Sequence, residues 1–246
     1  VYAYAKSHPN ELGVDIKTQV SVDYGTKANF EECKPQSIHT IVVSAPCVES
    51  MSIERVRDLI GNLIDSAGLP KGLYDKSKTI IYINPTGRYV NHSSLHDSGL
   101  TGRKLIVDSF GGYSPIGGGA QSSKDYTKVD RSGLYAARYI AKNIVAAGLA
   151  KKCIVQLSYA IGVAKPVSVS VDCMGTNLGA ASDDELSAFV LEKFPLTPRW
   201  IIYKFGLDRP GKGSFLYADV AARGQVGNDE YPWEQLDSVD LFKALK

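Results

Sequence analysis

Hydrophobic residues recur along this chain with the two periods that mark strands and helices. Residues 37–45 (SIHTIVVSA) contain an Ile-Val-Val run that is typical of a buried β-strand. Residues 78–87 (KTIIYINPTG) form a second apolar run, which proline and glycine end. Between them, residues 52–68 place apolar side chains three and four positions apart, as on one face of a helix. Ser52 can cap the start of this helix, and Gly68 can end it.

The same alternation continues in the second half of the chain. Residues 132–148 are rich in alanine, carry a clear apolar stripe and end in a glycine, so they predict the strongest helix of the sequence. Residues 152–164 and 166–173 predict two strands, the second with alternating valine and serine. Residues 182–194 open with the Ser-x-x-Glu spacing of a capping box and predict another helix. A last short helix is expected after Asp240.

Two further segments complete the expected organisation. Residues 103–110 (RKLIVDSF) predict a short strand that enters a glycine-rich region. Residues 208–234 contain many glycines and predict a long surface loop. The mixture of strands and helices predicts an α+β fold, or repeated α/β units, with antiparallel sheets.

Composition narrows the class of protein. The 246 residues suit one large domain or two to three small ones, and 44% hydrophobic with 22% charged residues is ordinary for a globular protein. The 28 basic and 26 acidic residues give a net charge of +2, too balanced to predict nucleic-acid binding. No apolar run approaches the ~18 residues that cross a membrane, and the first residues do not form a secretory signal. Four cysteines without a CxxC pair fit a reduced, cytoplasmic protein.

One stretch, Gly99–Ser132, joins seven glycines to five Lys/Arg and three Asp residues. Glycine lets a backbone approach a ligand closely, Lys and Arg neutralise phosphates, and Asp can hold a cation such as magnesium. The exposed amides at the start of the following helix add positive potential. The stretch therefore either binds an extended polyphosphate or forms turns with solvated charges, and its composition leaves both interpretations open. It lacks the Gly-Lys-Ser/Thr ending of a P-loop, so P-loop chemistry is not supported.

The order and spacing of these residues go beyond composition. GLTGRKLIVDSFGG, GGGAQSSKD, KVDRSGLYAARYIAKNIVAAGLA and VQLSYAIGVAKPVSVSV closely resemble segments of the S-adenosylmethionine synthetase (methionine adenosyltransferase) family. DIKTQV at 15–20, INPTGRY at 83–89 and YPWE at 231–234 resemble further segments of that family. The resemblance spans almost the entire chain. It implies an α+β fold of repeated α/β domains, with mixed or antiparallel sheets packed against helices.

The resemblance also implies how the chain is divided and what it binds. Residues 1–91 would form a first α/β domain, 92–133 part of a second, incomplete domain with the polyphosphate loop, and 134–246 a third. The expected ligands are ATP and methionine, with Mg²⁺ and K⁺ as cofactors. Family enzymes are dimers or dimers of dimers, so we expect a homo-oligomer or a complementary chain as partner. Nucleic acid and membranes are not expected partners, and the expected location is the cytoplasm.

The implied activity is synthesis of S-adenosylmethionine. The sulfur of methionine attacks C5′ of ATP, and the whole triphosphate leaves and is then hydrolysed. The positions that match the family's catalytic cations are Lys17, Arg103, Lys104 and Lys124. The positions that match its ATP contacts are Asp15, Lys17, Arg88, Tyr89, Asp97, Arg103, Lys104, Ala120 and Lys124. The methionine contacts would be Asp97 and Lys128, and the magnesium ligand Asp130. No position matches the potassium ligand.

The chain departs from the family pattern in two ways. The family's N-terminal region, with its His-Pro-Asp-Lys motif, has no match, because the His-Pro of residues 8–9 lies in the wrong place, beside DIKTQV. Within the matched segments, Gln121 and Ser123 replace a phenylalanine and a glycine, and residues 91–94 (NHSS) replace Ile-Gly-Gly-Pro. Two interpretations follow. The chain is part of a synthetase that is inactive until joined to the missing N-terminal part, or it is a catalytically silent nucleotide-binding or regulatory subunit of a complete synthetase.

Overall fold

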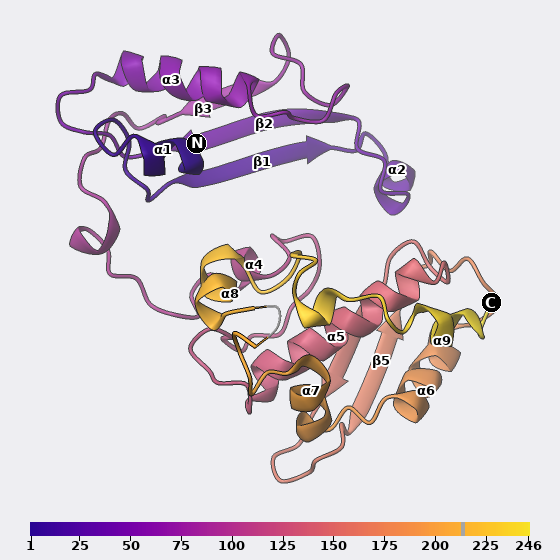
Figure 1. Ribbon diagram of the computed structural model, residues 1–246. Helices are drawn as coiled ribbons and strands as arrows, with labels where there is room; N and C mark the ends of the chain where they lie inside the picture. Colours follow the sequence, from indigo (N-terminus) through magenta and orange to yellow (C-terminus); the bar gives the residue numbers. More distant parts are fainter. Residues whose placement is uncertain (213–214) are drawn as a thin grey trace. The chain divides into compact units, whose positions relative to one another are not determined.

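The computed structural model describes residues 1–212 and 215–246, and the chain divides into two compact units, residues 1–99 and residues 100–246. Both units are drawn in Figure 1, coloured along the chain. Each unit has its own hydrophobic core. The expected boundaries at residues 91 and 133 stay predictions.

The first unit is a three-stranded sheet with a helix against it. β1 (Lys17–Asp23) pairs antiparallel with β2 (Ser37–Ser44), and β2 pairs parallel with β3 (Ile80–Ile83). α3 (Ile53–Asp65) connects β2 to β3 and lies along the sheet in Figure 1. Parallel neighbours need such a crossover because the chain must return to the same end of the sheet. The buried side chains that join helix and sheet are Val56, Leu59, Ile60 and Ile64 of α3 and Ile38, Ile41 and Val43 of β2. The unit also contains α1 (Tyr2–Ser7), α2 (Lys27–Glu31) and the 3₁₀ turn η1 (Ser93–Leu95).

Asn84 ties the end of β3 to the end of β2. Its backbone φ of 44° lies in the left-handed region, which asparagine enters more readily than most residues. Its side-chain Nδ2 donates to the carbonyl of Ala45 at 2.9 Å, and its Oδ1 accepts from the backbone N–H of Ala45 at 2.9 Å. Asn84 is buried, so the start of the NPTGRY segment has a structural role that sets the course of the residues after it.

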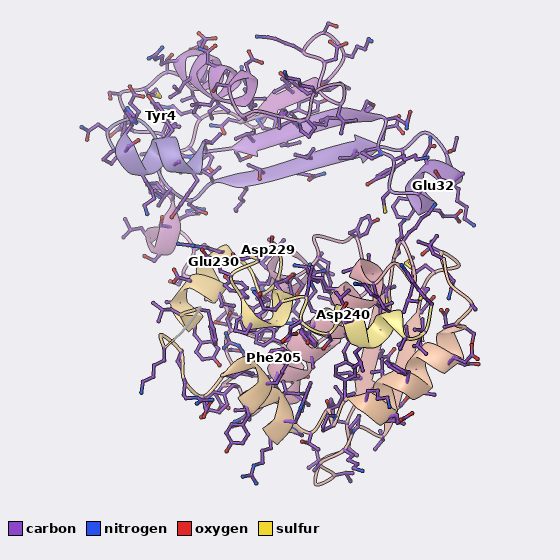
Figure 2. The ribbon with its side chains drawn as sticks, turned by 45° about the vertical axis from the view of Figure 1, so that its right-hand side comes forward. Tyr4, Glu32, Phe205, Asp229, Glu230 and Asp240 are labelled. Carbon is purple, nitrogen blue, oxygen red and sulfur yellow. The ribbon has the colours of Figure 1, made fainter. Side chains whose placement is uncertain are left out.

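The second unit packs helices on a two-stranded sheet. β4 (Ile154–Ser158) pairs antiparallel with β5 (Ser168–Asp172). The 18-residue helix α5 (Val129–Ala146) contacts β4, and α6 (Asp183–Lys193) contacts β5. α7 (Pro198–Phe205) packs on α5, and its last residue, labelled in Figure 2, is buried in the core.

The prediction of a surface loop over residues 208–234 is wrong. The described part of this segment contains α8 (Tyr217–Arg223) and the 3₁₀ turn η2 (Pro232–Glu234), whereas residues 213–214 lie outside the described residues. Trp233 is fully buried, and its ring stacks on that of Tyr135 with 3.8 Å between the centroids. The glycines of this segment make bends, but Phe215, Val220 and Tyr231 between them are buried as well, whereas Leu216 is exposed.

The prediction of a strand over residues 103–110 is also wrong. Leu105–Asp108 form one helical turn, α4, because the backbone N–H of Asp108 donates to the carbonyl of Lys104 at 2.9 Å. The carbonyl of Asp108 in turn accepts from the backbone N–H of Gln225 at 2.7 Å. A short apolar run is compatible with a strand or a helix, and here the hydrogen bond from the distant Gln225 favours the helical turn.

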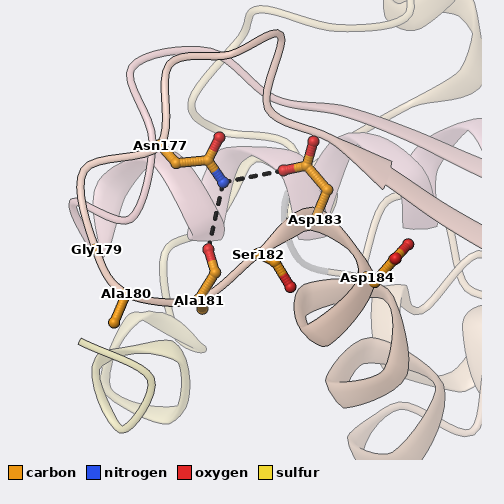
Figure 3. Close-up of a pocket in the computed structure, with 7 residues that line it drawn as sticks. All are labelled: Asn177, Gly179, Ala180, Ala181, Ser182, Asp183 and Asp184. Atoms are coloured by element: carbon orange, nitrogen blue, oxygen red, sulfur yellow. Dashed lines mark hydrogen bonds between the residues drawn. The ribbon is translucent and has the colours of Figure 1, made fainter.

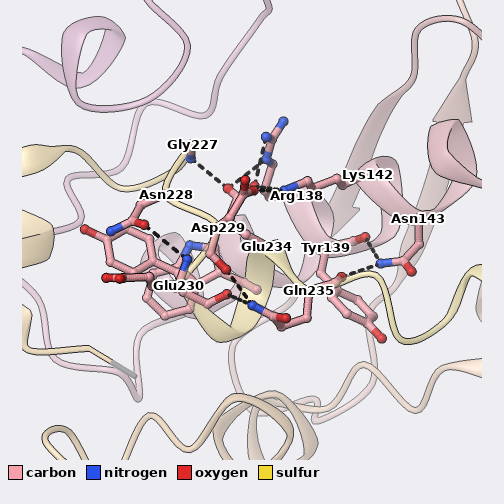
Figure 4. A network of polar contacts seen from close by, with 12 residues as sticks. Arg138, Tyr139, Lys142, Asn143, Gly227, Asn228, Asp229, Glu230, Glu234 and Gln235 are labelled. Atoms are coloured by element: carbon pink, nitrogen blue, oxygen red, sulfur yellow. Dashed lines mark hydrogen bonds and ion pairs between the residues drawn. The ribbon is translucent and has the colours of Figure 1, made fainter. Parts of the chain in front are cut away.

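Glu234 is buried at the end of η2 and joins this segment to α5 (Figure 4). Its carboxylate accepts from Nε and Nη2 of Arg138 at 2.9 and 3.0 Å, and it lies 2.9 Å from Nζ of Lys142. The backbone N–H of Gly227 donates to it at 2.8 Å. Burial by itself raises the pKa of Glu234, but the hydrogen bonds from Arg138, Gly227 and Lys142 outweigh burial and lower the pKa below its ordinary value.

Most predicted elements are confirmed, with ends shifted by up to six residues. β2, α3, β3, α5, β4, β5 and α6 lie where the hydrophobic pattern places them, and the last helix is α9 (Val239–Lys243). The α+β class, with one mixed and one antiparallel sheet, is confirmed as well. Within the described residues, none of the helices combines the length and the apolar character that crossing a membrane requires.

Replacing Ser182 with alanine is expected to lower the free energy of unfolding by about 1 kcal/mol. Ser182 Oγ accepts from the backbone N–H of Glu185 at 3.2 Å, and Glu185 Oε2 accepts from that of Ser182 at 2.8 Å, which confirms the capping box. Alanine cannot accept, whereas Ser182→Thr keeps a hydroxyl and should stay within about 0.5 kcal/mol of the parent. Urea unfolding followed by circular dichroism measures both, and equal losses in the two variants would contradict the cap.

Candidate functional site

In the second unit, two parts of the Gly99–Ser132 stretch pack against each other. A Cβ added at Gly102 would lie 2.6 Å from the Cβ of Ala120, so no side chain fits at this position. The φ of Gly102 is +84°, a conformation that favours glycine. This close approach brings the segment that continues into Arg103 and Lys104 beside the loop that carries Ala120.

Asp130 lies against the same loop. It belongs to the first turn of α5, and a Cβ added at Gly119 would lie only 2.3 Å from its carboxyl group. Nζ of Lys124 forms an ion pair with the carboxylate of Asp130. Ala120, Lys124 and Asp130, three of the predicted ligand residues, therefore meet at the N-terminus of α5.

A second ion pair flanks the first. Nζ of Lys128 lies 2.8 Å from Oδ2 of Asp125, and this contact, with hydrogen bonds from Thr127, lowers the pKa of Asp125. The four side chains of the two pairs are between 32% and 55% exposed. Exposed pairs contribute only about 0–1 kcal/mol each, so an anionic ligand and a cation can take over these partners at little cost.

Arg103 and Lys104 differ from these lysines because they form no ion pair with any residue that the structure describes. Both side chains are exposed at the start of α4. Lys104 Nζ lies 3.5 Å from the carbonyl oxygen of Arg103. Their charges are therefore available to an anion that approaches the Ala120 loop.

In the first unit, the structure brings Asp15 and Tyr89 together. The hydroxyl of Tyr89 donates to the backbone carbonyl of Asp15 at 3.4 Å, and Oδ2 of Asp15 accepts from the backbone N–H of Ser93 at 3.2 Å. Burial, followed by the charge of Asp15, raises the pKa of Tyr89. Lys17 is exposed at the start of β1, two residues after Asp15.

Arg88 and Asp97 lie elsewhere in the first unit. Nη1 of Arg88 donates to the backbone carbonyl of Met51 at 3.1 Å and to that of Glu49, so this guanidinium holds the turn before α3. Asp97 is exposed, and its Oδ1 accepts from the backbone N–H of Gly99 at 2.8 Å. The structure thus places the expected ligand residues in separate groups on the two units, and a single site formed by all of them stays a prediction.

The site supplies too few carboxylates to hold a metal ion alone, but it fits a metal ion that is also bound by a ligand. No group of three or more His, Cys, Asp or Glu side chains with metal-binding spacing occurs among residues 1–212 and 215–246. Asp130 supplies one carboxylate. Mg²⁺ is commonly held by one or two carboxylates together with phosphate oxygens and water, so Asp130 fits a magnesium ion that arrives with a phosphate ligand.

A hollow between Asn177 and Asp184 lies apart from these residues (Figure 3). It lies at the N-terminus of α6, where the capping box already uses the backbone N–H of Ser182 and Glu185. Nδ2 of Asn177 donates to Asp183 at 3.0 Å, and two carboxylates line the hollow, so it is unsuited to phosphate. None of the predicted ligand residues borders it.

Two buried polar residues absent from the sequence predictions lie beneath the Ala120 loop. Arg131 donates to the backbone carbonyl of Lys124 at 2.8 Å, and Gln225 donates to Ser122 Oγ at 2.8 Å. Arg131 is one of the five basic residues of the Gly99–Ser132 stretch, and its place in the first turn of the following helix is a further signal. Gln225 carries no local signal, because it meets the loop only in the folded chain.

Two family models match this chain. The model of the central domain of S-adenosylmethionine synthetase matches residues 2–89, and the model of the C-terminal domain matches residues 92–235. A solved structure titled as that of an unusual S-adenosylmethionine synthetase from Campylobacter jejuni matches with a TM-score of 0.95 and 77% sequence identity. The match covers 100% of this chain and 63% of that chain.

Proposed function

Because this chain belongs to the S-adenosylmethionine synthetase family, we propose that it forms the triphosphate-binding part of a methionine adenosyltransferase. The observation that carries the proposal is the meeting of Ala120, Lys124 and Asp130 at the N-terminus of α5, beside the segment of Arg103 and Lys104. Three cations, a carboxylate and a glycine-lined backbone are what a magnesium-bound polyphosphate requires.

The proposed reaction places the largest charge change on the triphosphate. The sulfur of methionine forms a bond to C5′ of ATP, the bond from C5′ to the phosphate-bearing oxygen breaks, and its electron pair leaves with the triphosphate. Arg103, Lys104 and Lys124 bind that leaving group. Cations that are in place before the bond breaks stabilise the developing charge without reorganisation.

The remaining residues take the other parts of the substrates in this proposal. Asp15, Lys17, Arg88 and Tyr89 would bind ATP, the last two near its adenosine. Asp97 would lie between nucleotide and methionine, and Lys128 on the methionine side. Asp130 would hold Mg²⁺, which neutralises part of the triphosphate charge when bound. K⁺ is included from the family alone. An oligomer, or a chain that supplies the rest of the site, and a cytoplasmic location complete the proposal.

The test uses this chain joined at Val1 to the part of the Campylobacter jejuni synthetase that precedes the matched central domain, termed here the extended chain. The 77% identity over the matched part is the reason for choosing this synthetase as the donor. We expect the extended chain to form S-adenosylmethionine from ATP and methionine with Mg²⁺ and K⁺, and the 246-residue chain alone to form little or none. The product is measured by chromatography.

The outcomes separate the two interpretations of the sequence. Turnover by the extended chain, with none by the 246-residue chain, supports the interpretation that this chain is part of an active synthetase. Robust turnover by the 246-residue chain would show that no further segment is needed. ATP binding by both chains without turnover by either would instead support a silent nucleotide-binding subunit.

A further inference from the structure

The Ala120 loop, residues 120–124, rests on a buried polar network that the proposed chemistry does not use directly. Arg131 and Gln225 are 4% and 1% exposed, and the hydroxyl of Tyr135 lies between them. Nε of Arg131 donates to this hydroxyl at 2.9 Å, and the hydroxyl donates to Oε1 of Gln225 at 2.7 Å. A continuous chain of hydrogen bonds therefore connects Arg131 to Gln225 through Tyr135.

Each end of the network holds one point of the loop. Nη1 of Arg131 donates to the backbone carbonyl of Lys124 at 2.8 Å. Nε2 of Gln225 donates to Oγ of Ser122 at 2.8 Å. The loop follows three glycines, Gly117–Gly119, which have more backbone freedom than other residues, so these two points limit its motion.

Gln225 is itself fixed on every side. Besides its two side-chain contacts, its backbone N–H donates to Asp108 at 2.7 Å, and its carbonyl accepts from Nε1 of Trp233 at 2.8 Å. All four polar groups of a 1%-exposed residue are thus engaged, which makes it a rigid support. Through Asp108, the same residue also holds the end of α4, the turn that follows Arg103 and Lys104.

Arg131 adds charge to this support. Its guanidinium lies 4.2 Å from the ring centroid of Tyr217, and no carboxylate pairs with it in the part of the chain that the structure describes. A buried cation without an anionic partner raises the potential around it, because the surroundings screen it weakly. Arg131 therefore contributes both a hydrogen bond and a positive charge next to the backbone of Lys124.

We propose that Arg131 and Gln225 are positioning residues for triphosphate. They fix the backbone of residues 122–124, so that Lys124 is already in its binding position when the phosphates arrive. This inference rests on the proposed function and deepens it. Displacing a catalytic group by about 1 Å can cost about 10²-fold, so a support that removes such freedom has a measurable effect. The network acts through Lys124, and the effect of changing Arg131 therefore depends on the presence of the Lys124 side chain.

The test is a double-mutant cycle that combines changes at Arg131 and Lys124. Calorimetry measures how tightly each variant of the 246-residue chain binds inorganic tripolyphosphate in the presence of Mg²⁺. Arg131→Lys keeps the charge but not the forked geometry, and is expected to weaken binding about tenfold. In a Lys124→Ala background, the same change should weaken binding less than about twofold. Ser122→Ala, which removes the acceptor on the loop and leaves the side chains of Arg131 and Gln225 in place, should weaken binding by about threefold. Arg199→Lys, an exposed arginine on α7, is the matched control and should change nothing.

The failures are distinguishable. An Arg131→Lys effect of equal size in both backgrounds, or unaltered binding in both Arg131→Lys and Ser122→Ala, overturns the positioning role, and so does a parent chain that binds no tripolyphosphate. Melting temperatures identify a variant that has lost its fold, in which case Ser122→Ala with Lys124→Ala carries the cycle. The proposed function is judged separately by turnover of the extended chain, which can fail while the binding cycle succeeds.

Discussion

Replacing Glu234 with alanine is expected to lower the free energy of unfolding of the second unit by about 3–5 kcal/mol. The side chain of Glu234 is 0% exposed, whereas Arg138 and Lys142, its two partners, are 28% and 22% exposed. These cations lie four residues apart on α5, so without the carboxylate they face each other across one turn of helix. Removing the buried partner costs more than the pairs contribute, because Arg138 and the backbone N–H of Gly227 lose this acceptor, whereas Lys142 keeps Asp229 at 2.7 Å.

Urea unfolding followed by tryptophan fluorescence measures this loss in the second unit alone. Both tryptophans of the chain, Trp200 and Trp233, belong to that unit. The matched control is Glu230→Ala, an exposed glutamate four residues away, which should change the free energy by less than about 0.5 kcal/mol. A loss below about 1 kcal/mol in Glu234→Ala would show that the ion pairs do not hold the segment.

The same residue gives the parent chain a pH dependence of known sign. The pKa of Glu234 in the folded chain lies below its ordinary value of 4.5, so the unfolded chain takes up this proton first as the pH falls. The stability that Glu234 contributes is therefore complete above its unfolded pKa and is lost as the pH falls through its folded pKa. Unfolding measured between neutral and acidic pH should show a shallower decline in Glu234→Ala than in the parent chain.

Replacing Lys104 with alanine in the extended chain is expected to lower kcat by about 10²–10³-fold. The leaving triphosphate gains charge as the bond to C5′ breaks, and Lys104 is exposed, unpaired among the described residues and close in sequence to the Gly102–Ala120 contact. A cation that meets charge developing in the transition state changes kcat more than the affinity for the substrate. Steady-state kinetics with ATP as the varied substrate separates the two quantities.

The control for this change is Lys71→Ala, which removes an exposed lysine of the first unit and should leave kcat and the Michaelis constant for ATP as they are. An unaltered kcat in Lys104→Ala would show that the triphosphate contact is assigned to the wrong residue. An increase in the Michaelis constant at constant kcat would place Lys104 on the ground-state nucleotide instead.

The elements with strong periodicity could be predicted from the chain alone. The α3 helix and the β2 strand carry long apolar patterns that cover whole elements, and the capping box of α6 is local in sequence. β1 was missed because most of its residues are exposed and its apolar positions are few. α4 was predicted as a strand because four apolar residues are too few to show a period, and its end is held by Gln225 from far along the chain.

The candidate site shows the same division. Motif order predicts which residues belong to the polyphosphate loop, and the structure brings Ala120, Lys124 and Asp130 together. Motif order could not predict that Lys124 pairs with Asp130, because ion pairs depend on side-chain positions rather than on spacing. Nor could it find Gln225, which contacts Tyr135 across 90 residues of chain.

The bond between Ser122 and Gln225 has a consequence for biosynthesis. The two residues are 103 positions apart, and Gln225 is the later one. At the ribosomal rate of about 5–20 residues per second, Gln225 is translated roughly 5–20 s after Ser122. For that interval the nascent chain lacks the hydrogen bond that holds Ser122, so the turn of residues 122–124 reaches its final shape only when nearly the whole polypeptide has been made.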